Sequence, residues 1–452
     1  MAPPAVNTPF RDPDFGSRMV RITNANTLAE EGSFFIGYSF MTDASAEANV
    51  WSAFDPTIGV HGGYRFIITN TGGWEMPFVL DATTMQVNRP AGRRGGYLYT
   101  HGELNFASSF SFNNPDILYG LQGMQLVSYN FATDALSAIY NFDACPNLPA
   151  YVPGYGGSVS NSADGTKFAY YFGGRRQGDT ELVVYYDRTA NGGAGACSWY
   201  DTKLGVVGGT DMANKRVAGG VGGWAGYNVH NARISKNGTV IKINKNGDSG
   251  IYFWKAGTNQ VAPCPALGAD CGGHQALGYT HFINDPNDRD MIDIKIRPLS
   301  SLAAIRPLVS SFPVLRQWSD SHWSWNDANP SDTTPVCGSF YNSHGQGNGT
   351  QNVQTNPLLR ITAPYDREIV CVATSGPSKV WRFAHDRATS ALNDNAWAGS
   401  SFWATPRGNV SPDGRFYLFT SDWEWRLGNR KDTWGCPAEG HCRTDVFIVE
   451  LH

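Results

Sequence analysis

The chain has 452 residues, of which 39 are acidic and 35 basic, and its formal net charge is −4. No long basic run occurs, so the concentrated positive patch that nucleic-acid binding requires is absent, and we expect no nucleic-acid partner. No stretch approaches 18 consecutive apolar residues, so we expect no membrane span. Abundant aromatic residues (13%) and 51 glycines favour many short strands joined by turns.

A short unit recurs along the chain: an extended stretch, a polar turn of the type N/S-x-D/N-G, and a second extended stretch. An extended segment at 32–40, followed by a strand–turn–strand pattern at 75–88, gives the first copy. Further copies lie at 108–121, 157–172, 230–243, 280–294, 322–336 and 407–423. Additional strands are predicted at 124–142, 250–261 and 379–389. Seven copies spaced by roughly 40 to 70 residues predict an all-β, seven-bladed β-propeller with four antiparallel strands in each blade.

We assign the whole chain, 1–452, to this single domain. The predicted blades span approximately 18–90, 97–145, 153–202, 224–265, 272–312, 319–389 and 400–452. The hairpin at 407–423 is then the inner half of the seventh blade, which is one strand short. The segment 17–23 is expected to supply that strand and close the ring, which removes the exposed edges of an open array. The alternatives are a large β-sandwich or two β domains, but no linker interrupts the repeat.

The eight cysteines form an even set without a C-x-x-C pair. We predict four local disulfides, Cys145–Cys197, Cys264–Cys271, Cys337–Cys371 and Cys436–Cys442. Since disulfides persist in oxidising compartments, we expect a secreted, periplasmic or cell-surface protein, the alternative being buried thiols in a cytosolic one. The first fifteen residues lack the apolar core of a signal peptide, so we expect any such peptide to be missing from this chain, with Met1 as an added start.

The segment "NVSPDGRFYLFTSDW" (409–423) is similar to the repeat of TolB-like propellers, in which an S-P-D-G turn leads into an apolar strand. That group includes translocation proteins, peptidase propellers and polysaccharide lyases of the oligogalacturonate- and ulvan-lyase kind. The resemblance implies the propeller fold and leaves the function open, since one fold hosts many functions.

Residues just upstream of the repeated turns are expected to approach the mouth of the central channel. His230, His281 and His322 occupy such positions although the chain has only ten histidines. This pattern suits β-elimination on a uronic-acid polysaccharide, which needs a base, an acid for the leaving oxygen and a group that neutralises the carboxylate. We predict His230 or His281 as the base, Tyr279 or Tyr227 as the acid, and Arg407 or Arg216 as the neutralising cation. The predicted substrate-binding residues are Asn231, His322, His274, Trp323 and Trp403. The resemblance to propeller lyases implies this reaction class, but no lyase motif matches this chain residue by residue.

Two further hypotheses stay open. His230, His281 and His322 could converge on one divalent metal, zinc or calcium, that is structural or holds the substrate carboxylate. Alternatively, the propeller binds a polysaccharide, oligosaccharide or protein without catalysis. Fourteen tryptophans offer stacking surfaces for sugars, although Trp323, Trp325, Trp423 and Trp425 would equally suit packing between blades. We expect a monomer with a carbohydrate ligand.

Overall fold

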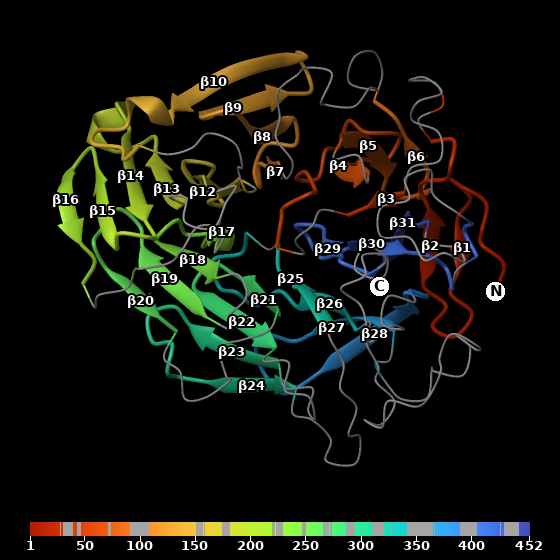
Figure 1. Ribbon diagram of the computed structural model, residues 1–452. Helices are drawn as coiled ribbons and strands as arrows, with labels where there is room; N and C mark the ends of the chain where they lie inside the picture. Colours follow the sequence, from red (N-terminus) through yellow and green to blue (C-terminus); the bar gives the residue numbers. More distant parts are fainter. Residues whose placement is uncertain are drawn as a thin grey trace.

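The computed structural model describes most of the chain. The described residues are 1–27, 29, 39–42, 47–70, 74–90, 108–150, 157, 159–173, 181–218, 222, 229–245, 250–264, 271, 274–285, 294–309, 321–326, 328–340, 365, 367–388, 405–424, 426–428 and 443–452. Their strands form seven antiparallel sheets arranged in a ring (Figure 1), which confirms the predicted seven-bladed β-propeller.

Each sheet is one blade, and its strands run in order from the centre of the ring outward. The first blade holds β3 (Phe40–Met41), β4 (Gly63–Asn70), β5 (Glu75–Asp81) and β6 (Val87–Asn88), and the second β7 (Ser109–Phe110), β8 (Ile117–Gln122), β9 (Gln125–Asn130) and β10 (Ala135–Asn141). The third holds β11 (Ser160–Asn161), β12 (Lys167–Gly173), β13 (Glu181–Asp187), β14 (Ala196–Asp201), β15 (Val206–Gly209) and β16 (Met212–Arg216). The fourth holds β17 (Val229–Ile234), β18 (Val240–Lys245), β19 (Ile251–Lys255) and β20 (Val261–Pro263), and the fifth β21 (His274–Leu277), β22 (His281–Asp285), β23 (Ile294–Pro298) and β24 (Arg306–Val309). The sixth holds β25 (Ser321–Ser324), β26 (Val336–Phe340), β27 (Glu368–Val372) and β28 (Val380–His385), and the seventh β29 (Asn409–Val410), β30 (Phe416–Ser421), β31 (Asp445–Glu450), β2 (Arg18–Arg21) and β1 (Phe10–Arg11). Two short 3-10 turns, η5 (Phe142–Ala144) and η6 (Asn191–Gly193), lie in the second and third blades.

The repeated turn has a common hydrogen-bond pattern, seen in the hairpin of β29 and β30. The hydroxyl of Ser411 donates to Oδ1 of Asp413 at 2.7 Å, and the backbone N–H of Gly414 donates to the carbonyl of Ser411 at 2.9 Å. Gly414 has a φ of 74°, a left-handed conformation that glycine adopts without steric cost. The same side-chain bond recurs between Ser111 and Asn113, Ser162 and Asp164, and Ser235 and Asn237. The repeat in the sequence therefore marks a real turn of the inner hairpins.

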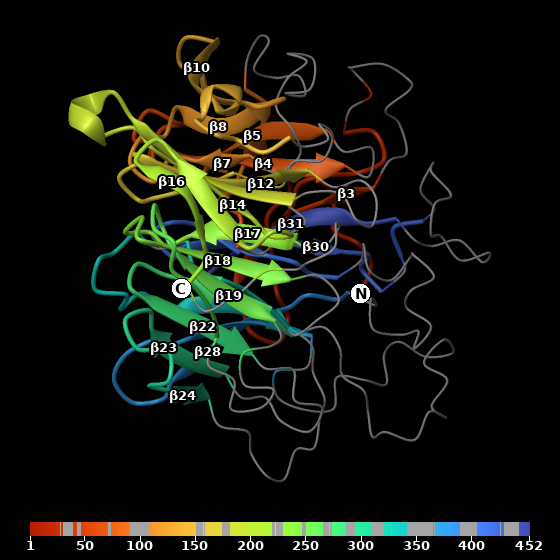
Figure 2. The same ribbon diagram turned by 60° about the vertical axis from the view of Figure 1, so that its left-hand side comes forward.

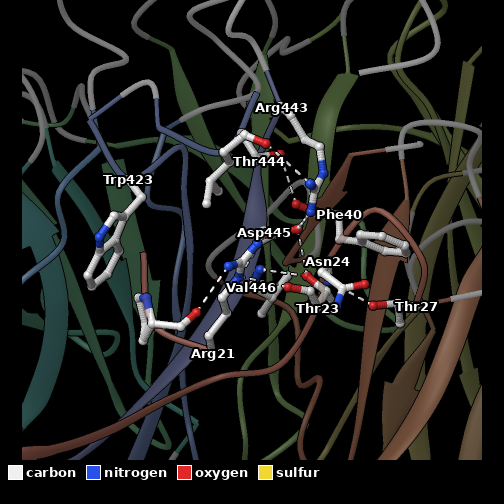
Figure 3. Close-up of polar contacts among 12 residues, drawn as sticks. Arg21, Thr23, Asn24, Thr27, Phe40, Trp423, Arg443, Thr444, Asp445 and Val446 are labelled. Atoms are coloured by element: carbon white, nitrogen blue, oxygen red, sulfur yellow. Dashed lines mark hydrogen bonds and ion pairs between the residues drawn. The ribbon is translucent and has the colours of Figure 1, made fainter. Parts of the chain in front are cut away.

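The N-terminal segment closes the ring, as predicted. β2 pairs with β31 in antiparallel register, Val20 facing Ile448, and β1 adds a fifth strand outside it. The buried carboxylate of Asp445 joins the two ends of the chain: Arg21 and Arg443 each contact it at 2.5 Å (Figure 3). Burial raises the pKa of this carboxyl, and Arg443 and Arg21 oppose that rise.

The third blade is larger than predicted. Strands β15 and β16 extend the sheet outward beyond the expected boundary at residue 202, and Figure 2 shows β16 near the front of the turned ring. The carboxylate of Asp201 accepts the N–H groups of Lys203 and Leu204, at 2.9 and 2.8 Å, so a tight turn folds β15 back onto β14. This turn lacks the repeated serine, so the repeat gave no signal for the extra strands.

Three of the four predicted disulfides are present, Cys145–Cys197, Cys264–Cys271 and Cys337–Cys371. The fourth, Cys436–Cys442, lies outside the described residues. The three bridges fit an extracytoplasmic protein. In the described part of the chain, no helix has the length and apolar character of a membrane span.

Candidate functional site

The innermost strands of the blades begin at one face of the ring, and we call this end of the ring axis the channel mouth. His274 is the first residue of β21, and His230 and His322 are the second residues of β17 and β25. Arg407 precedes β29 by two residues. Since the innermost strands start at the same face of the ring, four neighbouring blades bring three imidazoles and a guanidinium to one place.

Two of the three imidazoles are in contact, and the third, His230, interacts electrostatically with both. The ring centroids of His274 and His322 are 4.0 Å apart, with an angle of 43° between the rings. His274 acts electrostatically on His230, and both His230 and Arg407 act on His322. His230 is exposed, His274 half-buried and His322 buried, so the cluster runs from the solvent into the channel wall.

Two of these imidazoles are held in the neutral form. Desolvation by the surrounding protein lowers the pKa of His230, and electrostatic contributions from His274 and Lys242 lower it further, while Glu47 opposes them. Burial lowers the pKa of His322 well below 6.5, with smaller contributions from His274 and Arg407. At neutral pH both rings are therefore proton acceptors.

A buried ion pair borders the histidines. The ammonium of Lys242, on β18, contacts the carboxylate of Glu47 from the segment after β3, and donates to Oε1 of Gln275 at 2.9 Å. The pKa of Lys242 is lowered by burial, and the carboxylate of Glu47 opposes that shift. Sequence analysis missed Lys242 and Glu47, because Lys242 is in a second strand and Glu47 lies outside the repeated turns.

The structure places His281 and Tyr279 at the other end of the fifth blade. His274 pairs with Asp285 and Leu277 with Phe282, so His281 lies at the turn that joins β21 to β22. This corrects the alignment of 280–294 as an inner hairpin, because His281 begins the second strand. At about 3.3 Å per residue, the two ends of β21 are about 10 Å apart. His281 does not join His230 and His322.

A carboxylate from the sixth blade holds His281. Oδ2 of Asp332 lies 3.0 Å from Nδ1 of His281 and accepts the hydroxyl of Thr280 at 2.7 Å. The backbone N–H groups of Tyr279 and Thr280 also donate to Asp332, at 2.5 and 2.6 Å. Asp332 thus replaces the serine and aspartate that the turn of the fifth blade lacks. We call these contacts of Asp332 with residues 279–281 the clamp. The predicted base His281 and the predicted acid Tyr279 therefore lie in a structural contact between the fifth and sixth blades.

The other predicted residues have different surroundings. Arg216 is exposed on β16, the outermost strand of the third blade, away from the inner strands. Trp323 is fully buried among the side chains of the fifth and sixth blades, and its indole N–H donates to Ser321 at 2.8 Å, so its ring packs in the core rather than against a ligand. Asn231 follows His230 on β17 and is buried. Tyr227 and Trp403 lie outside the described residues.

The predicted metal ligands do not form one group. Among the described residues, one set of three His, Cys, Asp or Glu side chains has ligand atoms that all lie within 4.8 Å of one another: Asp12, Asp14 and His385. This set could hold a metal ion. It lies between the N-terminal hairpin and β28, far along the chain from the predicted set of His230, His281 and His322.

Comparisons with known proteins support the fold. The chain is similar to the crystal structure of oligogalacturonate lyase from Vibrio parahaemolyticus, with a TM-score of 0.51, 9% sequence identity, and coverage of 98% of this chain and 96% of that one. It is also matched to TolB from Acinetobacter baumannii, with a TM-score of 0.30 and 10% identity, over 97% of this chain and 65% of TolB. No protein-family model and no curated protein sequence matches. At 9% identity, the first similarity shows the fold alone.

Proposed function

We propose that this propeller is exported, binds a uronic-acid-containing polysaccharide at the channel mouth, and cleaves it by β-elimination. The observation that supports this function is the gathering of His230, His274 and His322 beside Arg407, with lowered pKa values at His230 and His322. Neutral imidazoles next to cationic side chains suit the removal of a proton from an anionic sugar. The distant structural similarity to a lyase is consistent with this reaction class.

In the proposed reaction, His230 is the base, because it is the exposed imidazole of the cluster. It takes the proton at C5, next to the uronate carboxylate. The electron pair of that C–H bond forms the C4–C5 double bond as the C4–O bond breaks. An acid then protonates the leaving oxygen, a role that we propose for Tyr227. Arg407 contributes positive charge that stabilises the carboxylate as negative charge develops on it.

The neighbouring residues position this chemistry. The hydroxyl of Tyr171 donates to the backbone carbonyl of His230 at 3.1 Å, which fixes the start of β17. The buried ammonium of Lys242 disfavours protonation of His230, and the carboxylate of Glu47, its ion-pair partner, opposes this effect. Together these contacts keep a basic imidazole at the mouth at neutral pH.

The test measures near-ultraviolet absorbance of the unsaturated uronate on a panel of acidic polysaccharides, with and without EDTA. We expect a rise on at least one polymer, and a loss of about 10²–10⁴-fold in kcat/KM for His230→Ala. His281→Ala is the matched control, because it also removes an imidazole from an inner hairpin but at the end away from the channel mouth. This variant should retain activity within about twofold. A flat trace from the folded protein, with binding retained in His230→Ala, would replace the lyase by a non-catalytic carbohydrate-binding propeller. Equal losses in both variants would contradict the assignment of the mouth.

A further inference from the structure

A second group of polar side chains lies at the outer edge of the ring, where the N-terminal hairpin meets the sixth blade. Asp12 and Asp14 follow β1, and His385 ends β28, the outermost strand of the sixth blade. No residue of the proposed reaction lies in this group. The group combines two segments that lie far apart in the chain, since Asp12 and His385 are separated by 373 positions.

The carboxylate of Asp12 is fixed before any ligand arrives. Its Oδ1 accepts the backbone N–H groups of Asp14 and Phe15 at 2.9 and 3.0 Å, and its Oδ2 accepts the N–H of His385 at 3.2 Å. Asp12 is buried, whereas the side chain of Asp14 is 59% exposed. One carboxylate is therefore rigid and the other can adjust.

The imidazole of His385 is buried and directed toward these carboxylates. Its side chain is 6% exposed, and Nδ1 makes no hydrogen bond of acceptable geometry with the part of the chain that the structure describes. The nearest charged atom is Oδ2 of Asp14, at 3.2 Å from Nδ1. Phe15 packs against the imidazole with ring centroids 5.0 Å apart, and the guanidinium of Arg382 lies 5.1 Å from the Phe15 ring centroid. These contacts hold the ring in place.

The donor set selects the kind of ion. Zinc binds imidazole nitrogen and carboxylate oxygen at about 2.0–2.1 Å in a tetrahedral arrangement, which sets neighbouring donor atoms about 3.3 Å apart. The separation of 3.2 Å between His385 and Asp14 agrees with that value, and the ligand atoms of all three residues lie within 4.8 Å of one another, so a bound ion would draw Asp12 closer. Calcium prefers oxygen donors alone, so the buried imidazole argues against it. Two carboxylates balance the charge of a divalent cation.

We propose that Asp12, Asp14 and His385 bind a zinc ion that ties the N-terminal hairpin to the sixth blade. Three protein ligands leave one position for water. The ion joins β1, the outermost strand of the seventh blade, to β28, so it strengthens the closure that β2 makes with β31. This site is independent of the channel mouth and of the proposed lyase reaction.

The experiment uses the full chain, stripped of metal with EDTA and dialysed, and then titrated with zinc by calorimetry, with metal analysis and thermal unfolding in parallel. Asp14→Asn removes the exposed ligand and should leave the fold intact, as circular dichroism would verify. We expect the wild type to bind one more equivalent of zinc than Asp14→Asn does, or to bind zinc at least about a hundredfold more tightly at this site. Zinc at roughly a hundred times its Kd should raise the Tm of the wild type by about 3 °C but not that of the variant.

A matched control separates this site from the histidines of the channel mouth, which could also take up zinc. His230→Gln should keep the zinc-dependent rise in Tm, and His385→Gln should lose it. If Asp14→Asn and His385→Gln bind zinc as the wild type does, the proposal is wrong. It is equally wrong if all zinc binding disappears in His230→Gln, or if the wild type binds none, because His385 and Asp14 would then form a simple ion pair.

Discussion

His274 and His281 lie on the same hairpin, yet their surroundings differ. His274 begins β21 at the channel mouth and packs against His322 with the two rings tilted, and His230 and Arg407 act electrostatically on His322. His281 begins β22 at the turn and faces the carboxylate of Asp332 at 3.0 Å. At the mouth, burial lowers the pKa of His230 and of His322, and the neighbouring basic groups lower both pKa values further, which favours neutral rings. At the turn, a carboxylate and a hydroxyl hold the imidazole in a structural role.

The difference shows that neither residue type nor position in the repeat is sufficient to identify a functional histidine. The partner groups decide. A cluster of bases that repel one another when protonated has shifted pKa values, which is typical of functional sites. A carboxylate whose oxygens all accept hydrogen bonds from the protein instead stabilises the fold.

The largest expected effect on stability comes from breaking the clamp. Asp332→Ala removes the acceptor for the N–H groups of Tyr279 and Thr280 and for the Thr280 hydroxyl, and leaves His281 without its carboxylate. We expect the free energy of unfolding to fall by about 2–3 kcal/mol, since these partly exposed donors lose a buried, charged acceptor. Denaturant unfolding measures it.

Asp116→Ala is the control for the clamp, because it removes a carboxylate that pairs with Arg65 at a more exposed position. Its expected cost is below about 1 kcal/mol. The elimination activity that we propose for the channel mouth should persist in folded Asp332→Ala. A similar small cost for both variants would show that Asp332 does not hold the fifth blade.

A smaller effect concerns pH. Because the folded-state pKa values of His230 and His322 lie below the ordinary 6.5, the unfolded chain binds protons first as the pH falls. The stability of the wild type should be fully present above about pH 6.5 and decline below it, toward the folded-state pKa values. In His322→Gln this decline between pH 7.5 and 5.5 should be shallower.

The measurement is the free energy of unfolding by denaturant at several pH values in that interval. His281→Gln serves as the comparison, because it removes an imidazole from the other end of a hairpin and so reports the general effect of losing a histidine. An unchanged slope in His322→Gln would mean that this buried imidazole does not resist protonation, and the contrast between the two ends of the hairpins would fail.

Much of the fold could be predicted from the sequence because the blades carry local signals. The Ser-x-Asp-Gly turn around Ser411 is stabilised by hydrogen bonds between residues a few positions apart, so a local sequence pattern is sufficient to predict it. Ring closure followed from the missing strand of the seventh blade. The pairing of Cys145, Cys264 and Cys337 with their nearest suitable partners was also predictable from spacing.

The parts that sequence analysis missed depend on distant partners. The turn of the fifth blade has no serine or aspartate of its own, because Asp332, 52 positions beyond Thr280, supplies the acceptor. Without that local signal, His281 was aligned one strand too far inward. Lys242 and Glu47 meet across 195 positions, and no local pattern marks such a pair.

The smallest expected effect concerns the two arginines predicted as neutralising cations. Arg216 is exposed on the outer strand β16, whereas Arg407 is buried beside His322. Arg216→Ala should therefore change kcat/KM by less than about twofold and the free energy of unfolding by less than about 0.5 kcal/mol. Arg407→Lys keeps the charge but loses the planar donor fork, and should lower kcat/KM by about tenfold. Steady-state kinetics on the polysaccharide that gives the strongest absorbance change shows which of the two arginines contributes to the reaction. A larger loss of kcat/KM for Arg216→Ala than for Arg407→Lys would contradict binding at the channel mouth. It would indicate that the substrate binds at the outer edge of the third blade, where Arg216 is exposed.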